Sequence, residues 1–176
     1  MPNYKELESN LIDVVKEIQA KIGYSKDPVY LYYPLDSLNS ILETDCDEDG
    51  MFAELENFRG NNVISKNIKY SCDNERFCII IPEDGVTYIH QNIPDVPFLM
   101  DFLDAVQRHG QTLEDIVTVF EKYSPCVKVE KIENGEFDYT IYFEDGVPDK
   151  YRYCIKFEAD HTIYHRFTIK DYEDLL

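Results

Sequence analysis

The sequence predicts one α+β domain over residues 1–176, with an N-terminal helix, a central β-hairpin, a helical middle and a C-terminal four-stranded antiparallel meander packed on the helices. Apolar residues recur at helical spacing near the N-terminus and across residues 82–120. Four runs between residues 125 and 168 alternate apolar and polar side chains, with the two-residue period of a half-buried strand. A length of 176 residues suits a single compact core.

The first third of the chain predicts three helices and one short strand. Apolar residues three and four apart predict an amphipathic helix over residues 3–21, which Gly23 ends. Residues 29–33 are rich in β-prone side chains and stop at Pro34. Two shorter helical patterns follow, one before and one after the acidic stretch 44–50.

A hairpin and three helices are predicted in the middle of the chain. The runs 68–72 and 76–81 flank a polar turn, and the second run is apolar on both faces, which is typical of a central strand. Three helical patterns then occupy residues 82–120. Thr112 followed by Asp115 resembles a capping box, so the third of these helices is expected to begin there.

The alternation in the meander predicts which side chains share a face. Odd-numbered residues such as Ile155 are expected to face the helices, and even-numbered residues such as Thr140 to face outward. Residues directly opposite each other in an antiparallel pair share a face. A three-residue loop at residues 133–135 satisfies this condition and places Val129 opposite Tyr139.

The same reasoning favours a three-residue loop at residues 159–161, which places Lys156 opposite Tyr164. His165 then alternates with Ile163 on the packed face, where we expect a core histidine. The outward face is either a solvated surface held by cross-strand ion pairs or a partner-binding surface, because Tyr and Arg are frequent interface hot spots. Its candidate binding residues are Tyr142, Arg152, Lys156, Tyr164 and Arg166.

Composition restricts the possible partners and the compartment. The chain has 17 Lys and Arg against 35 Asp and Glu, a formal charge of −18, which argues against binding to nucleic acid or anionic lipid and favours a basic protein partner. Five cysteines without a C-x-x-C spacing predict neither a disulfide framework nor a zinc knuckle. We expect a cytoplasmic protein without a secretion signal or a membrane span.

Four stretches resemble the blocks of a small bacterial family that is known only as a domain of unknown function. They are residues 11–24 (LIDVVKEIQAKIGY), 31–42 (LYYPLDSLNSIL), 76–90 (RFCIIIPEDGVTYIH) and 164–175 (YHRFTIKDYEDL). The resemblance covers nearly the whole chain and implies a bacterial single domain. It implies no activity, ligand or catalytic residue.

One acidic segment follows the ligand order of an EF-hand calcium loop. Asp45, Asp47, Asp49 and Glu56 occupy positions one, three, five and twelve, and Gly50 occupies position six. The alternative is an acidic turn between helices. We assign no metal and expect calcium binding to be weak at most, because the following helix is cut short and no second copy of the loop exists.

No known catalytic motif occurs in the sequence. The four histidines, His90, His109, His161 and His165, match no metal-binding spacing. Cys78 and His90 are the candidates for a ligand pocket between helices and sheet, although burial is the simpler interpretation of Cys78.

These observations favour a non-enzymatic, acidic protein-binding domain of a regulatory or immunity-like kind, with no cofactor. A small-ligand binder or enzyme, and a weak calcium-binding protein, are the alternatives. The sequence gives no indication of oligomeric state.

Overall fold

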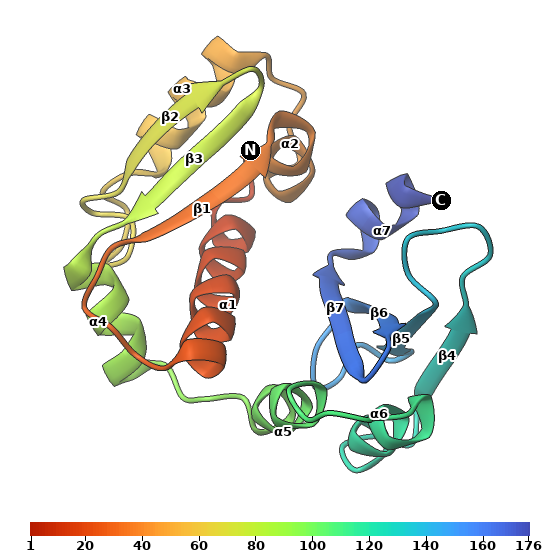
Figure 1. Cartoon of the computed structure of the whole chain (residues 1–176). Coiled ribbons are helices and arrows are strands. Elements are labelled where there is room, and N and C mark those ends of the chain that lie inside the picture. The colour runs from red at the N-terminus through yellow and green to blue at the C-terminus, as the bar shows by residue number, and fades with distance from the viewer. The chain divides into compact units, whose positions relative to one another are not determined.

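The computed structural model describes all 176 residues, which form two compact units, Met1–Asp95 and Val96–Leu176. Each unit contains one antiparallel sheet and its own helices (Figure 1). The predicted α+β class is therefore confirmed, whereas the single-domain organisation stays a prediction. None of the helices combines the length and the apolar character needed to cross a bilayer.

The first unit contains four helices and a three-stranded sheet. In chain order its elements are α1 (Tyr4–Ile22), β1 (Val29–Pro34), α2 (Leu35–Leu42), α3 (Glu48–Phe58), β2 (Lys69–Asp73), β3 (Arg76–Ile81) and α4 (Glu83–Asn92). The strand order β1-β3-β2 confirms that the apolar run is the central strand. Asn74 and Glu75, with φ of 49° and 60°, form the two-residue turn of the predicted hairpin.

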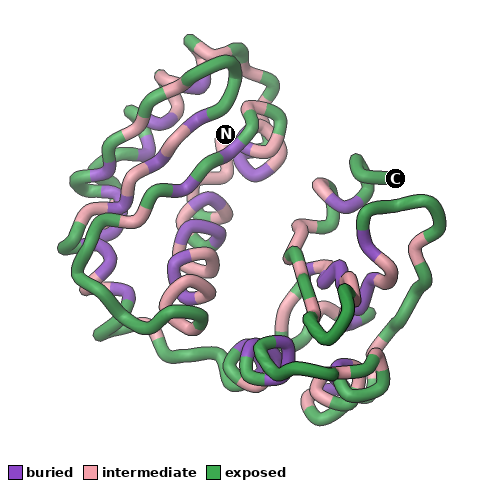
Figure 2. Tube along the Cα trace, in the orientation of Figure 1, coloured by how far each residue is buried: buried purple, intermediate pink, exposed green.

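All four helices of this unit pack on one face of its sheet. The inward side chains of β1 and β3 are buried with residues of α1, α2, α3 and α4 in one apolar cluster. Along β1 and β3 these buried positions alternate with exposed or half-buried ones (Figure 2). The sheet residues of the cluster are Leu31, Tyr33, Phe77, Ile79 and Ile81.

The second unit contains the meander and three helices. Its elements are α5 (Pro97–Val106), α6 (Leu113–Glu121), β4 (Val127–Lys131), β5 (Tyr139–Phe143), β6 (Arg152–Glu158), β7 (His161–Phe167) and α7 (Ile169–Leu175). The strand order β4-β5-β6-β7 confirms the four-stranded meander. Thr112 and Asp115 form the predicted capping box at the start of α6.

Aromatic side chains fill the space between α5, α6 and the meander. Phe98 of α5 has edge contacts with Phe120 of α6 at 4.8 Å and with Phe143 of β5 at 4.9 Å between ring centroids. Phe102 contacts Tyr153 of β6 at 4.8 Å. These edge-to-face pairs hold the helices on one face of the sheet.

The β4–β5 register differs from the predicted one. Val129 lies opposite Ile141, not opposite Tyr139, because the connection is longer than three residues. A hydrogen bond of 2.9 Å from the Ile132 amide to the Asp138 carbonyl closes this longer connection. The side chains of β4 and β5 still lie on the predicted faces of the sheet, because the observed register differs from the predicted one by two residues.

The β6–β7 register also differs, and here the face changes. Ala159, with φ of 51°, and Asp160 form a two-residue turn, so Ile155 lies opposite Tyr164 and Lys156 opposite Ile163. The one-residue shift turns Ile163 and His165 away from α5 and α6. The expectation of a core histidine is therefore wrong, because His165 is exposed.

The outer face of the meander is covered in part by α7. Tyr172 packs against Cys154 and Phe137, and all three side chains are buried. Thr140, expected to point into solvent, is fully buried on this face. The sheet is thus packed on both sides near β5 and β6.

Candidate functional site

No helix of the first unit covers the face of the three-stranded sheet that points away from its helices, and we call this surface the open face. Strand pairing places Tyr30 beside Ile80, and Tyr32 beside Cys78, on this side. The edge strand β2 adds more polar side chains. The open face comprises Tyr30, Tyr32, Pro34, Lys69, Ser71, Asp73, Arg76, Cys78 and Ile80.

Its centre is aromatic and aliphatic. Tyr30 and Tyr32 are 56% and 57% exposed, and Cys78 and Ile80 between the edge strands are half-buried. The guanidinium of Arg76 lies over the Tyr32 ring at 5.6 Å from its centroid. A cation held over an aromatic ring presents a flat surface that combines apolar and charged groups.

The predicted partner-binding residues do not share one face. Tyr142, Arg152 and Lys156 lie on the outer face of the meander, as predicted. The shifted register places Tyr164 and Arg166 on the opposite face, where the Tyr164 ring contacts Phe102 at 5.0 Å.

Arg166 belongs to a packed aromatic group. Its guanidinium lies 4.4 Å from the centroid of Tyr151, which is buried. Beside it the Tyr153 hydroxyl donates a hydrogen bond of 2.5 Å to Asp149. Burial raises the pKa of Tyr153 well above its usual value, and the nearby Asp149 carboxylate raises it further. This group joins β6 to β7 by packing.

Cys78 and His90 do not meet. Cys78 lies on the open face, whereas α4, which carries His90, packs through Val86 and Ile89 on the other side of the sheet. His90 is exposed and stacks on Tyr24 at 4.0 Å between ring centroids.

A surface groove of about 630 Å³ runs beside α4. Neither Cys78 nor His90 lines it. The groove is lined by Val63, Pro82, Glu83, Asp84, Thr87, Tyr88 and Gln91.

The four acidic residues of the EF-hand-like segment are not brought together. Helix α3 begins at Glu48, so the backbone is helical over most of the segment. Asp47 caps this helix and accepts a hydrogen bond of 2.8 Å from the Gly50 amide. Asp49 and Glu56 are separated by about 10 Å along the helix axis, from a rise of 1.5 Å per residue. Asp45 precedes the helix altogether.

Glu56 has other partners on the protein. The Tyr70 hydroxyl donates a hydrogen bond to it and lowers the pKa of its carboxyl, and Arg59 lies 3.6 Å away. The carboxylate that would be the twelfth calcium ligand is therefore directed toward β2.

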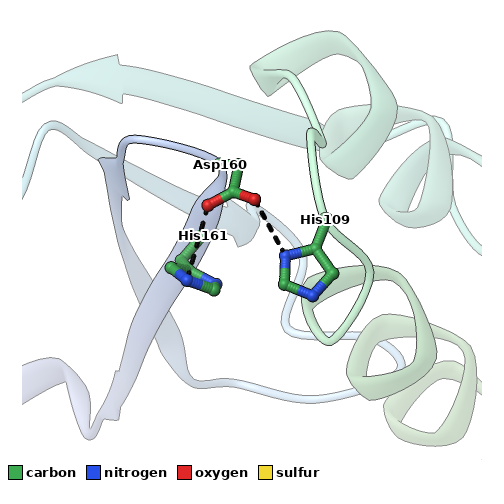
Figure 3. Close-up of side chains that lie close together, drawn as sticks. All are labelled: His109, Asp160 and His161. Atoms are coloured by element: carbon green, nitrogen blue, oxygen red, sulfur yellow. Dashed lines mark ion pairs between the residues drawn. The ribbon is translucent and has the colours of Figure 1, made fainter.

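A cluster that sequence reasoning missed lies in the second unit. Asp160 lies between His109 and His161, with Oδ2 3.1 Å from His109 Nδ1 and Oδ1 3.4 Å from His161 Nε2 (Figure 3). His109 is far from the other two in sequence, so no spacing rule connects them. The adjacent Asp160-His161 pair was the only local signal.

Comparison with protein families finds one match that covers nearly the whole chain. The family described as "Domain of unknown function, E. rectale Gene description (DUF3877)" matches residues 4–176. Comparison with curated proteins and with solved structures finds no match. The chain therefore belongs to the DUF3877 family, which has no assigned activity.

Proposed function

We propose that this chain is a non-enzymatic protein-binding module of the bacterial cytoplasm, of a regulatory or immunity-like kind, and that its open face docks a basic protein partner. One observation carries the proposal. Tyr30 and Tyr32 are each more than half exposed on a sheet face that no helix of the unit covers.

The composition of the open face suits a protein interface. An antiparallel sheet with one side in water usually carries polar side chains on that side. Here the central strand contributes Cys78 and Ile80, and tyrosines flank them on β1. Tyrosine and arginine are enriched among the residues that dominate binding energy, and tyrosine buries a large area with only two side-chain torsions.

Charge favours a basic partner over a second copy of the chain. Residues 1–95 contain 18 acidic and 8 basic side chains, an excess of 10 negative charges. Two units of this net charge repel each other, whereas a basic protein is attracted to such a unit and its association is accelerated. All five cysteines are free thiols, which supports a reducing compartment.

Site-specific photo-crosslinking tests the proposal in the full chain. A photoreactive phenylalanine derivative replaces Tyr32 in one version and Tyr142 on the outer face of the meander in the control. We expect a discrete crosslink to one basic protein from position 32, weakened by salt and absent from position 142. Tyr30→Ser in the crosslinking version should reduce the yield.

Two results would contradict this assignment. A crosslink from position 142 but not from position 32 would move the interface to the meander. Crosslinks from neither position, or equal yields with and without Tyr30→Ser, would argue against docking on the open face.

A further inference from the structure

Backbone contacts bring two loops of the second unit together at the His109 cluster. His109 lies between α5 and α6, whereas Asp160 ends the β6–β7 turn and His161 begins β7. The Gly110 amide donates a hydrogen bond of 2.8 Å to the carbonyl oxygen of Asp160. The loop is thus held against the turn by the backbone, independently of the three side chains.

The side chains are arranged around one carboxylate. In Figure 3 the two imidazole rings flank Asp160, and each directs a nitrogen at one of its oxygens. The ring centroids of His109 and His161 are 4.9 Å apart. One ligand atom from each residue can be chosen so that all three lie within 4.8 Å of one another.

These separations are close to those of a coordination sphere. Two ligands of a tetrahedral ion with bonds of about 2.0–2.2 Å lie about 3.3–3.6 Å apart. The two histidine-to-aspartate separations are 3.1 and 3.4 Å. These two distances end on different oxygens of Asp160, so side-chain shifts on the order of 1 Å would bring one of these oxygens and both imidazole nitrogens to tetrahedral spacing.

We propose that His109, Asp160 and His161 bind a divalent transition-metal ion of the zinc class, with water completing the coordination. Two imidazoles and one carboxylate suit Zn²⁺, Ni²⁺ or Cu²⁺, whereas Ca²⁺ and Mg²⁺ require oxygen ligands. Three protein ligands leave one position of a tetrahedron open to solvent.

Ion pairing within this cluster would contribute little to the stability of the unit. The side chains of His109, Asp160 and His161 are 70%, 62% and 65% exposed, and exposed ion pairs contribute little to stability. A bound ion would instead link the α5–α6 loop to the start of β7. Since the ion binds only the folded arrangement, it would stabilise the unit in proportion to the logarithm of its concentration.

Metal titration of the full, metal-free chain tests the site. The probe is Zn²⁺, competed against a chromogenic chelator, and histidine ring nitrogens are followed by NMR. We expect one equivalent of Zn²⁺ to shift the ring signals of His109 and His161 and to leave those of His90 unchanged. His109→Ala, His161→Ala and Asp160→Asn should each weaken binding by about tenfold or more.

His90→Ala is the matched control, because His90 is also exposed but belongs to the other unit. Circular dichroism establishes that each variant is folded, which the exposure of the substituted side chains favours. Zn²⁺ affinity that is the same in all variants would assign binding to groups outside this cluster and overturn the proposal. So would ring shifts that are equal at all histidines, or no binding at all.

Discussion

The guanidinium carbon of Arg152 lies 3.3 Å from the centroid of the Tyr142 ring, across the outer face of the meander. The ring of Tyr172 in α7 is also near, at 5.8 Å. Nε and Nη1 of Arg152 are buried and have no hydrogen-bond partner. Contact with aromatic rings, and not hydrogen bonding through these two nitrogens, therefore positions this arginine.

Replacing Arg152 by lysine tests this contact. Arg152→Lys keeps the charge but removes the flat guanidinium, so we expect the free energy of unfolding to fall by about 0.5–2 kcal/mol. Urea denaturation measures the change. The control Arg108→Lys, at an exposed position, should cost less than about 0.5 kcal/mol. Equal costs at the two positions would show that the stacking adds nothing.

Two isoleucines on neighbouring strands test the observed register of β7. Ile155 is fully buried, whereas Ile163 is 43% exposed. Ile155→Ala should therefore lower the free energy of unfolding by about 2–5 kcal/mol, and Ile163→Ala by less than about 1 kcal/mol. If denaturant midpoints showed similar losses, Ile163 would have to face the helices.

Thiol labelling tests the cover that α7 forms over β6. Burial raises the pKa of the Cys154 thiol to about 11, so at pH 8 only about one thiol in a thousand is ionised. We expect iodoacetamide to modify Cys154 much more slowly than the half-buried Cys126. Tyr172→Ala should accelerate modification of Cys154 selectively.

Peptide mapping by mass spectrometry distinguishes the two cysteines in the same sample. Similar rates at Cys154 and Cys126 in the unmodified sequence would mean that α7 does not protect β6. An acceleration at both cysteines in the variant would indicate general unfolding instead of loss of the cover.

An acidic group between α5 and α6 predicts a dependence of stability on pH. A hydrogen bond of 2.6 Å from Lys122, with another from Tyr123, holds the pKa of Asp101 below its usual value. Its ionised form therefore stabilises the fold above the unfolded-state pKa of about 3.9, and this contribution disappears as the pH falls through the lower native pKa.

Asp101→Asn should accordingly destabilise the protein near neutral pH. The difference from the unmodified protein should be constant down to about pH 5 and should shrink below about pH 4. Thermal melts across this range measure it. A stability difference that increased as the pH fell would contradict the prediction that ionised Asp101 stabilises the fold.

Calcium should leave the stability of the chain unchanged. A micromolar site would add about 4 kcal/mol in 1 mM calcium, because only the folded state binds. Asp47 already caps α3 and Glu56 already binds Tyr70, so we expect melting curves in chelator and in millimolar calcium to coincide. A rise in melting temperature that Asp45→Asn abolished would contradict this prediction.

Features that depend on neighbouring residues could be predicted from the sequence. Thr112 and Asp115 are three residues apart, and the Thr112 amide and hydroxyl each donate to Asp115 at 2.9 Å. The apolar run of β3 likewise predicts a central strand without reference to its partner strands, and the strand order confirms it. In both cases the physical cause acts within one turn or one strand.

Features that depend on distant contacts could not be predicted in this way. A two-residue and a three-residue β6–β7 turn differ by one position, and the shorter turn requires Ala159 in a left-handed conformation that alanine rarely adopts. Pairing along the whole of β6 and β7 stabilises the shorter turn. The meeting of His109 with Asp160 depends in the same way on folding of the complete unit.

The β6–β7 turn connects strand pairing to ligand placement. Asp160 and His161 follow Ala159 directly, so one inserted residue would turn the side chains of β7 to the opposite faces of the sheet and also displace two of the three proposed metal ligands. The length of the turn thus acts as a shared constraint on packing and on chemistry. Family members that have a histidine, an aspartate and a histidine at these three positions are expected to have a two-residue turn. Members with a longer turn are expected to lack all three of these ligands.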